Sequence, residues 1–312
     1  MADICSCGTG LGNTGLPNCL EELKEVRALY LVQTFDSTGA RNYIDSTETI
    51  DDAFVVDKIN ENDYTKRWYP LTSLEEIGGE RADAIVKTSN SGTSKYVKQG
   101  NRTFTAQLWK GGSVLEANLK KGRCIEVAVY EVDASGKLVG MERDGKLYPI
   151  RIQKTTFDVK HVRATGAEPE YWNLSFQWDS REYDSELGYM EVEDDCDLLS
   201  YNGLIDIVST VSGISQTGFT LTLKSKFGAL NGKDKLTGLL ITDFFSAVGG
   251  TASRLYNVTD SSAVTISTFS ETSEGVYAFT FSSQPVADKI RITPVKTGYD
   301  FTAVISNTVT IA

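Results

Sequence analysis

Short runs in which apolar and polar residues alternate recur along most of the chain. Between residues 82 and 109 they lie at 84–88, 95–100 and 103–109, separated by glycine or by asparagine and serine. Successive side chains of a strand point to opposite faces of a sheet, and the separating residues favour turns. The pattern therefore predicts three short strands that form an antiparallel meander.

More runs of this kind lie on either side, within the first 200 residues. They cover residues 27–35, 123–132, 137–142, 148–162 and 171–178. Asp144 and Gly145 predict a tight hairpin turn, because both residue types accept positive φ angles. Residues 113–121 are predicted to form a helix, with Ser113 capping its start and Gly122 ending it. This region is therefore predicted to be all-β and mainly antiparallel, a sandwich or barrel with one short helix.

After residue 200 the composition changes to serine, threonine, glycine, valine and phenylalanine. Alternating runs continue at residues 218–224, 238–243, 263–269, 276–281, 289–294 and 301–311. Strands at such intervals, with turn residues between them, predict an immunoglobulin-like sandwich. This region has no Cys and no Trp, so it lacks the disulfide and the tryptophan of antibody domains. We expect two domains, residues 1–200 and residues 201–312.

Two segments of the first region carry weaker patterns. Residues 1–19 are small and glycine-rich and are predicted to be an extended arm. Residues 36–80 are polar and acidic and are predicted to be a long loop, and such loops are usually functional or ordered by a partner. The alternative for the aromatic residues of this loop is packing onto the core of their own subunit. The apolar residues of the loop form the predicted contact between subunits: Phe54, Val55, Val56, Trp68 and Tyr69.

The charge of the chain restricts its partners. With 31 Lys and Arg against 42 Asp and Glu, the formal net charge is -11 at pH 7. A nucleic-acid binder is not expected, because phosphates are neutralised by a surplus of basic side chains. We find no apolar run long enough to span a membrane and no leader pattern. We expect a soluble protein made in the cytoplasm, with no membrane span.

Catalytic chemistry has little support in the sequence. His161 is the one histidine, and it lies in the alternating run 157–163, which indicates an ordinary strand residue. Histidine is the commonest general base and metal ligand near neutral pH. The glycines at 8–12 follow no strand, so they do not form a phosphate-binding motif. We therefore expect no enzyme, no catalytic residue and no cofactor.

Metal binding is not expected either. Cys5 and Cys7 lack the spacing of common zinc sites, although together with Cys19 they leave a metal site or a disulfide open. Free thiols are the simplest interpretation of all the cysteines: Cys5, Cys7, Cys19, Cys124 and Cys196. The acidic residues between 179 and 197 show no calcium-loop spacing, and nothing singles out a catalytic pair among them. They predict a solvated loop or linker.

The features of the first 200 residues occur in a characteristic order. A terminal arm precedes a first strand, and the segment 36–80 comes before a strand pair that includes Tyr96–Phe104. A helix at 113–121 and a closing antiparallel set around Tyr148–Ile152 follow. In this order the region resembles the major tail tube proteins of tailed bacteriophages, which share a fold with the tubes of contractile injection machines. Members of that family also carry C-terminal immunoglobulin-like additions, which match residues 201–312, whereas the cysteine-bearing arm departs from the family pattern.

The resemblance implies a structural virion protein of the phage tail, made in the host cytoplasm. Sheets of neighbouring subunits would join into a closed β-barrel ring, commonly a hexamer, and rings would stack into a hollow tube. The arm and the segment 36–80 would be ordered by the adjacent ring. The partners would be further copies of the chain and other tail proteins, while DNA passes through without specific binding.

Two other functions fit the same sequence. One is a different virion component, such as a capsid decoration or baseplate protein. The other is a carbohydrate-binding module, in which the rings of Trp68, Trp109, Trp172 and Trp178 would stack on sugars. Three of these four lie in predicted strands, where packing in a core is the usual role.

Overall fold

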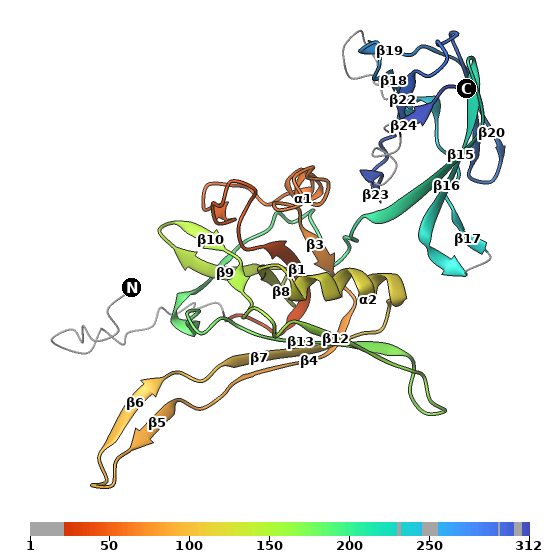
Figure 1. The fold of residues 1–312 in the computed structure, drawn as a ribbon. Coiled ribbons are helices and arrows are strands. Elements are labelled where there is room, and N and C mark those ends of the chain that lie inside the picture. The colour runs from red at the N-terminus through yellow and green to blue at the C-terminus, as the bar shows by residue number, and fades with distance from the viewer. Residues whose placement is uncertain (1–21, 230–231, 245–254, 293, 303–307) are drawn as a thin grey trace.

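The computed structural model describes residues 22–229, 232–244, 255–292, 294–302 and 308–312. Antiparallel strands dominate this part of the chain and form several sheets (Figure 1). The prediction of an all-β, mainly antiparallel fold is therefore confirmed. The predicted arm 1–19 lies outside the described residues.

The larger sheet of the N-terminal region is built from eight strands. Their bounds are Val26–Gln33 (β1), Ile44–Asp45 (β2), Tyr69–Leu71 (β3), Val127–Asp133 (β8), Leu138–Arg143 (β9), Lys146–Tyr148 (β10), Ile150–Arg151 (β11) and Leu187–Met190 (β14). The order is β2-β10-β9-β8-β1-β3, with β11 paired to β8 and β14 to β9. The predicted hairpin turn joins β9 to β10, and Asp144 and Gly145 have φ angles of 53° and 69°. The central strands β1 and β8 are therefore paired on both sides.

A second sheet of four strands lies against the first. It runs in the order β12-β13-β7-β4, and the bounds are Leu74–Arg81 (β4), Arg102–Leu108 (β7), Asp158–Val162 (β12) and Tyr171–Gln177 (β13). Alternate residues of β7, namely Phe104, Ala106 and Leu108, are buried, as strand geometry requires for one core-facing side. They pack with Leu29 and Val129 of the first sheet in one hydrophobic cluster. The two sheets thus form a β-sandwich.

The opposite face of the larger sheet is also covered. Tyr30 and other residues of β1 belong to a second cluster on that face, which is closed by the helix α1, Asp52–Ile59. Asp51 caps α1 by accepting a hydrogen bond from the backbone N–H of Phe54 at 2.8 Å, and Val55 is buried in the cluster. Both faces of the sheet are buried, which explains the nearly continuous apolar sequence of β1 and β8.

The prediction of a long loop at residues 36–80 is wrong. This segment contains β2, α1, β3 and most of β4. The polar stretches between these elements fold by local hydrogen bonds, such as those that Asp63 accepts from the backbone and hydroxyl of Thr65. The segment also closes the second cluster. Its apolar residues Val55, Ile59 and Trp68 are therefore buried within the same chain.

A two-stranded ribbon extends the four-stranded sheet. Its strands are Ile85–Thr88 (β5) and Ser94–Lys98 (β6), paired antiparallel. Because β5 follows β4 and β6 precedes β7, the four strands form one long hairpin that projects away from the sandwich (Figure 1). The predicted three-stranded meander is therefore wrong, although its strands exist. At the base of the ribbon a Cβ on Gly100 would lie 1.9 Å from the carbonyl oxygen of Ala82, so this close approach requires glycine.

The predicted helix at 113–121 is confirmed as α2, Ser113–Lys120. It is followed by the 3₁₀ turn η1, Lys121–Arg123, and a second such turn, η2, lies at Asp184–Glu186. The cap residue of α2 is Gly112, not Ser113, and Gly122 lies within η1. Leu119 points into the sandwich core, which fixes α2 against one end of the two sheets.

The C-terminal region contains two further sheets. The bounds are Ile205–Ser215 (β15), Gly218–Ala229 (β16), Gly232–Lys235 (β17), Ile241–Phe244 (α3), Leu255–Asn257 (β18), Ser262–Ala263 (β19), Ile266–Ser273 (β20), Val276–Phe281 (β21), Lys289–Ile292 (β22), Tyr299–Asp300 (β23) and Thr308–Thr310 (β24). The sheet orders are β20-β21-β16-β15-β23, with β17 paired to β16, and β19-β18-β22-β24. Both sheets contribute to one apolar cluster that is separate from those of the N-terminal region. The predicted strand at 238–243 is wrong, since α3 lies there.

Candidate interaction surfaces

The predicted interface residues of segment 36–80 separate into two groups. Val55 and Trp68 are 0% and 3% exposed, so they belong to the core of their own chain. The Trp68 ring lies 5.5 Å from the ring of Tyr30, and this packing corrects the prediction that Val55 and Trp68 contact another subunit. Tyr69 is 39% exposed, and Phe54 and Val56 are half-buried. A contact between these three residues and another subunit stays a prediction.

The ribbon, defined as residues 82–101, projects from the sandwich and carries exposed apolar side chains. Ile85, Val86, Tyr96 and Val97 are 47%, 51%, 51% and 55% exposed. Adjacent residues of a strand point to opposite faces, so both faces of the ribbon present apolar side chains to solvent. An isolated two-stranded hairpin is marginally stable in water. The ribbon is therefore a candidate docking surface.

The outer face of the four-stranded sheet is polar. The polar side chains that share this face by register come from all four strands: Glu75, Glu80, Thr103, Thr105, Gln107, Asp158, Lys160, Asn173, Ser175 and Gln177, with Val162 and Tyr171 at one end. Its two edge strands, β4 and β12, pair on one side only within the described residues. Unpaired strand edges are templates for pairing with another chain. This sheet thus combines a hydrophilic face with two open edges.

The acidic region 179–197 has two different halves. In the first half, Glu182 is fully buried and binds the guanidinium groups of Arg143 and Arg151. Asp184 binds Arg81 at 2.6 Å and Arg102 at 2.8 Å. Hydrogen bonds from Arg81, which outweigh burial, hold the pKa of Asp184 below its usual range. The prediction of a solvated loop is therefore wrong for this half, because its carboxylates fix the chain onto β4, β7, β9 and β11.

The second half of this region, residues 191–197, is named here the acidic segment. Its carboxylates are exposed, and in the described part of the chain none forms an ion pair: Glu191, Glu193, Asp194, Asp195 and Asp197. The backbone is nevertheless held firmly. Val192 bridges to Ile50, Cys196 is buried, and Leu198 just beyond accepts a hydrogen bond from the Tyr30 hydroxyl at 2.6 Å. The acidic segment is thus a rigid display of negative charge.

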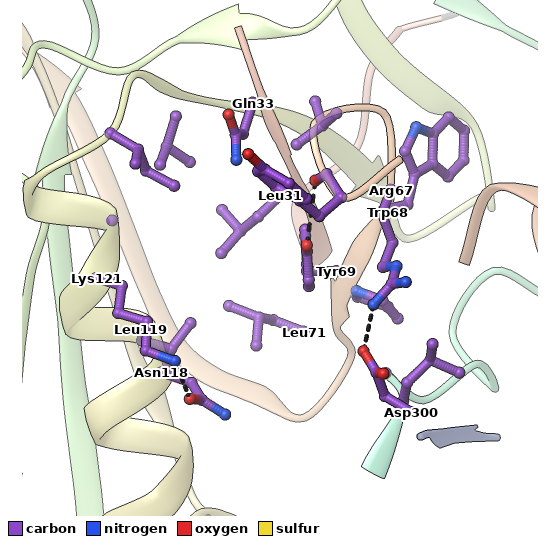
Figure 2. Close-up of a pocket in the computed structure, with 18 of the residues that line it drawn as sticks. Leu31, Gln33, Arg67, Trp68, Tyr69, Leu71, Asn118, Leu119, Lys121 and Asp300 are labelled. Carbon is purple, nitrogen blue, oxygen red and sulfur yellow. Dashed lines mark hydrogen bonds and ion pairs between the residues drawn. The ribbon is translucent and has the colours of Figure 1, made fainter. Parts of the chain in front are cut away.

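A cavity of about 560 Å³ lies between the N-terminal and C-terminal regions (Figure 2). Leu31, Leu71 and Leu119 line it, and Arg67 reaches across to Asp300 at 2.5 Å. Burial raises the pKa of Asp300, but hydrogen bonds from Thr302 and Arg67 outweigh burial and lower it. This ion pair holds the two regions together at the rim of the cavity.

The groups that would support other chemistry are dispersed. His161 lies in β12 as predicted, where it stacks on Trp172 at 4.9 Å and binds Glu170 at 2.6 Å. The described residues contain no group of three or more His, Cys, Asp or Glu side chains suited to a metal ion. Cys124 is an exposed free thiol and Cys196 a buried one, while Cys5, Cys7 and Cys19 lie outside the described residues.

The tryptophans do not form a common aromatic platform. Trp68, Trp172 and Trp178 are 3%, 7% and 2% exposed and pack in the cores of the N-terminal region. Trp109 is 51% exposed and donates a hydrogen bond from Nε1 to the side chain of Gln107. One exposed ring is a small stacking surface for a sugar.

Among the helices of the described residues, none has the length and apolar character needed to cross a membrane. The exposure of the ribbon was missed by reasoning from sequence, because exposure leaves no local pattern along the chain. No protein-family model matches the sequence, and no curated protein matches it either.

Proposed function

We propose that this chain is a structural subunit that assembles with copies of itself, and that it forms the tail tube of a tailed bacteriophage. The observation that carries the proposal is the ribbon. It presents Val86 and Tyr96 on a projection that its own described chain leaves uncovered. Apolar groups on a projecting hairpin are stabilised when a second protein surface buries them.

The open edges of the four-stranded sheet support closure into a ring. Pairing of β4 in one subunit with β12 in the next would satisfy the edge backbone groups of both strands. Repeated around an axis, such a head-to-tail contact produces a closed barrel. The ribbon, which continues this sheet, would then reach the next ring and connect the stack.

The polar face of this sheet supports its assignment to the inner wall of the tube. Thr105 and Ser175 offer hydroxyl groups there, and Glu75 and Glu80 add negative charge, whereas the charge of Asp158 is balanced by Arg123 and Lys160. Together with the formal net charge of -11, the two glutamates would repel DNA phosphates. A wall of this chemistry lets DNA slide without specific binding.

Electron microscopy of the purified full-length chain, combined with sedimentation velocity, tests the proposal. We expect rings or stacked tubes at high protein concentration. A chain that remains monomeric at every concentration would contradict self-assembly. Closed rings that never stack would favour a baseplate or capsid decoration protein, and binding to a glycan array would favour the carbohydrate-binding alternative.

A further inference from the structure

A ladder of alternating cations and aromatic rings lies on the larger sheet at its β2–β10 edge. The Lys146 ammonium is 3.8 Å from the centre of the Tyr43 ring, and the rings of Tyr43 and Tyr148 are 5.7 Å apart. The Arg41 guanidinium lies 4.5 Å from the centre of the Tyr148 ring. We name these four residues the Arg41 surface. Tyr43 is 45% exposed, so the ladder is open to solvent on one side.

Positive charge is in excess at the inner end of this ladder. Arg143 binds both Glu182 and Glu186, and Arg151 binds Glu182. Arg41 adds a third guanidinium beside the other two, against two carboxylates. Its Nε and Nη2 atoms are enclosed and have no hydrogen-bond partner in the described structure.

An enclosed guanidinium without an acceptor is energetically unfavourable. Burial, and then repulsion from Arg151, lowers the pKa of Arg41. Removing a charge from water costs free energy unless an opposite charge compensates it. Arg41 as a whole is partly exposed, so a carboxylate on a second protein could approach it from solvent and supply opposite charge without reaching the two enclosed atoms, and arginine is well suited to such a pairing.

The same chain contains the complementary group. The acidic segment presents Asp194 and Asp195 without basic partners, on a backbone held by Ile50 and by the buried Cys196. We infer that the Arg41 surface of one copy binds the acidic segment of a neighbouring copy. This inference rests on the proposed self-assembly. Because two different patches meet, the contact is heterologous, and repeating it builds a ring or a filament.

A phosphate ligand fits the Arg41 surface less well. Glu182 and Glu186 lie within the same cluster, and the formal net charge of the chain is -11. Both would repel the polyanionic backbone of a nucleic acid at long range. The Arg41 surface has two cations, Arg41 and Lys146, which match a short run of carboxylates better than a continuous polyanion, so a second copy is the favoured partner.

A charge exchange in the full-length chain tests the contact. Arg41→Glu is expected to raise the concentration needed for assembly by about tenfold or more, since it places like charges together. Asp194→Lys with Asp195→Lys should do the same, and the combined variant should recover assembly. Lys289→Glu is the matched control, because Lys289 is an exposed cation in β22 of the C-terminal region, away from the strand edges proposed to join subunits. Circular dichroism verifies that each variant is folded.

A peptide experiment separates this contact from self-assembly as a whole. A synthetic peptide of residues 189–199, with Cys196→Ser, is titrated into the full-length chain and into Arg41→Gln, and fluorescence anisotropy reports binding. We expect binding to the wild type that weakens at about 0.5 M salt and falls about tenfold in the variant.

The outcomes of these experiments distinguish a failure of the proposed function from a failure of the Arg41 contact. A wild-type chain that stays monomeric would contradict the proposed function. Assembly that survives Arg41→Glu, or equal binding of the peptide to both chains, would overturn this contact alone. Binding of a single-stranded oligonucleotide that depends on Arg41 would make the surface a phosphate site and also overturn it.

Discussion

Strand β8 and the ribbon both have strand-forming sequences, but they differ in how deeply their side chains are buried. Every residue of β8 is buried, whereas every residue of β5 and β6 is exposed. β8 lies between β1 and β9 and is covered on both faces, by the four-stranded sheet and by the cluster that contains α1. The ribbon has only its own two strands. Substitutions in the first environment should therefore change folding, and substitutions in the second should change association.

The largest effect is expected for Trp68→Ala in the cluster that covers β8. Removing a large buried aromatic side chain leaves a cavity, so we expect a loss of about 3–5 kcal/mol in the free energy of unfolding. Urea denaturation measures this loss. Tyr69→Ala is the matched control, because Tyr69 is the neighbouring aromatic residue and is 39% exposed. Its effect on stability should be below about 1 kcal/mol.

These two variants can also break the comparison. If Trp68→Ala has the same free energy of unfolding as the wild type but no longer assembles, Trp68 contributes to a contact between subunits. Its burial within the chain then contributes little to stability. If Tyr69→Ala reduces assembly without changing stability, the surviving part of the predicted interface gains direct support.

The next effect concerns the one glutamate of β8. Glu131 lies on the same face as Val129, toward the sandwich core, and burial raises its pKa to about 7 despite the nearby Arg102. A carboxyl group with a raised pKa binds its proton more tightly in the folded state. Stability therefore falls as pH rises from the unfolded value of 4.5 to about 7, and is constant beyond it. The expected fall is on the order of 3 kcal/mol.

Glu131→Gln removes this dependence, because glutamine has no proton to lose. The variant should be more stable than the wild type above pH 7 and similar to it near pH 4.5. Urea denaturation of both chains across this pH range provides the measurement. Parallel pH profiles would show that Glu131 is better solvated than its burial suggests.

The parts of the fold that were predictable have local causes. β7 was evident from its alternating residues, and the β9–β10 turn from Asp144 and Gly145. α1 was missed although Asp51 is a good cap, because few apolar residues mark its buried face and Val55 and Ile59 lie in an acidic stretch. Its burial depends on β1 and β8, which no local pattern reveals.

The candidate surfaces were harder to predict for a related reason. The alternation in β5 and β6 specifies strands, yet strands with the same alternation are buried in β7 and exposed in the ribbon. Arg41 is notable only through Tyr148, Arg151 and Glu182, which come from distant parts of the sequence. Such properties arise from tertiary contacts, so sequence alone left them open.

The smallest effect on stability is expected in the ribbon, and it sharpens the comparison most. Tyr96→Ser combined with Val97→Ser removes two exposed apolar side chains, at 51% and 55% exposure. Surface substitutions of this kind usually change the free energy of unfolding by less than about 0.5 kcal/mol. If another subunit buries these side chains, the same variant should weaken association by about 2 kcal/mol per contact or more. Val286→Ser is the control, because Val286 is 58% exposed in the C-terminal region. Thermal melting and electron microscopy of the wild type, the ribbon variant and the control provide the measurement. A ribbon variant with the melting temperature of the wild type and assemblies of normal length would show that the ribbon is not part of the interface.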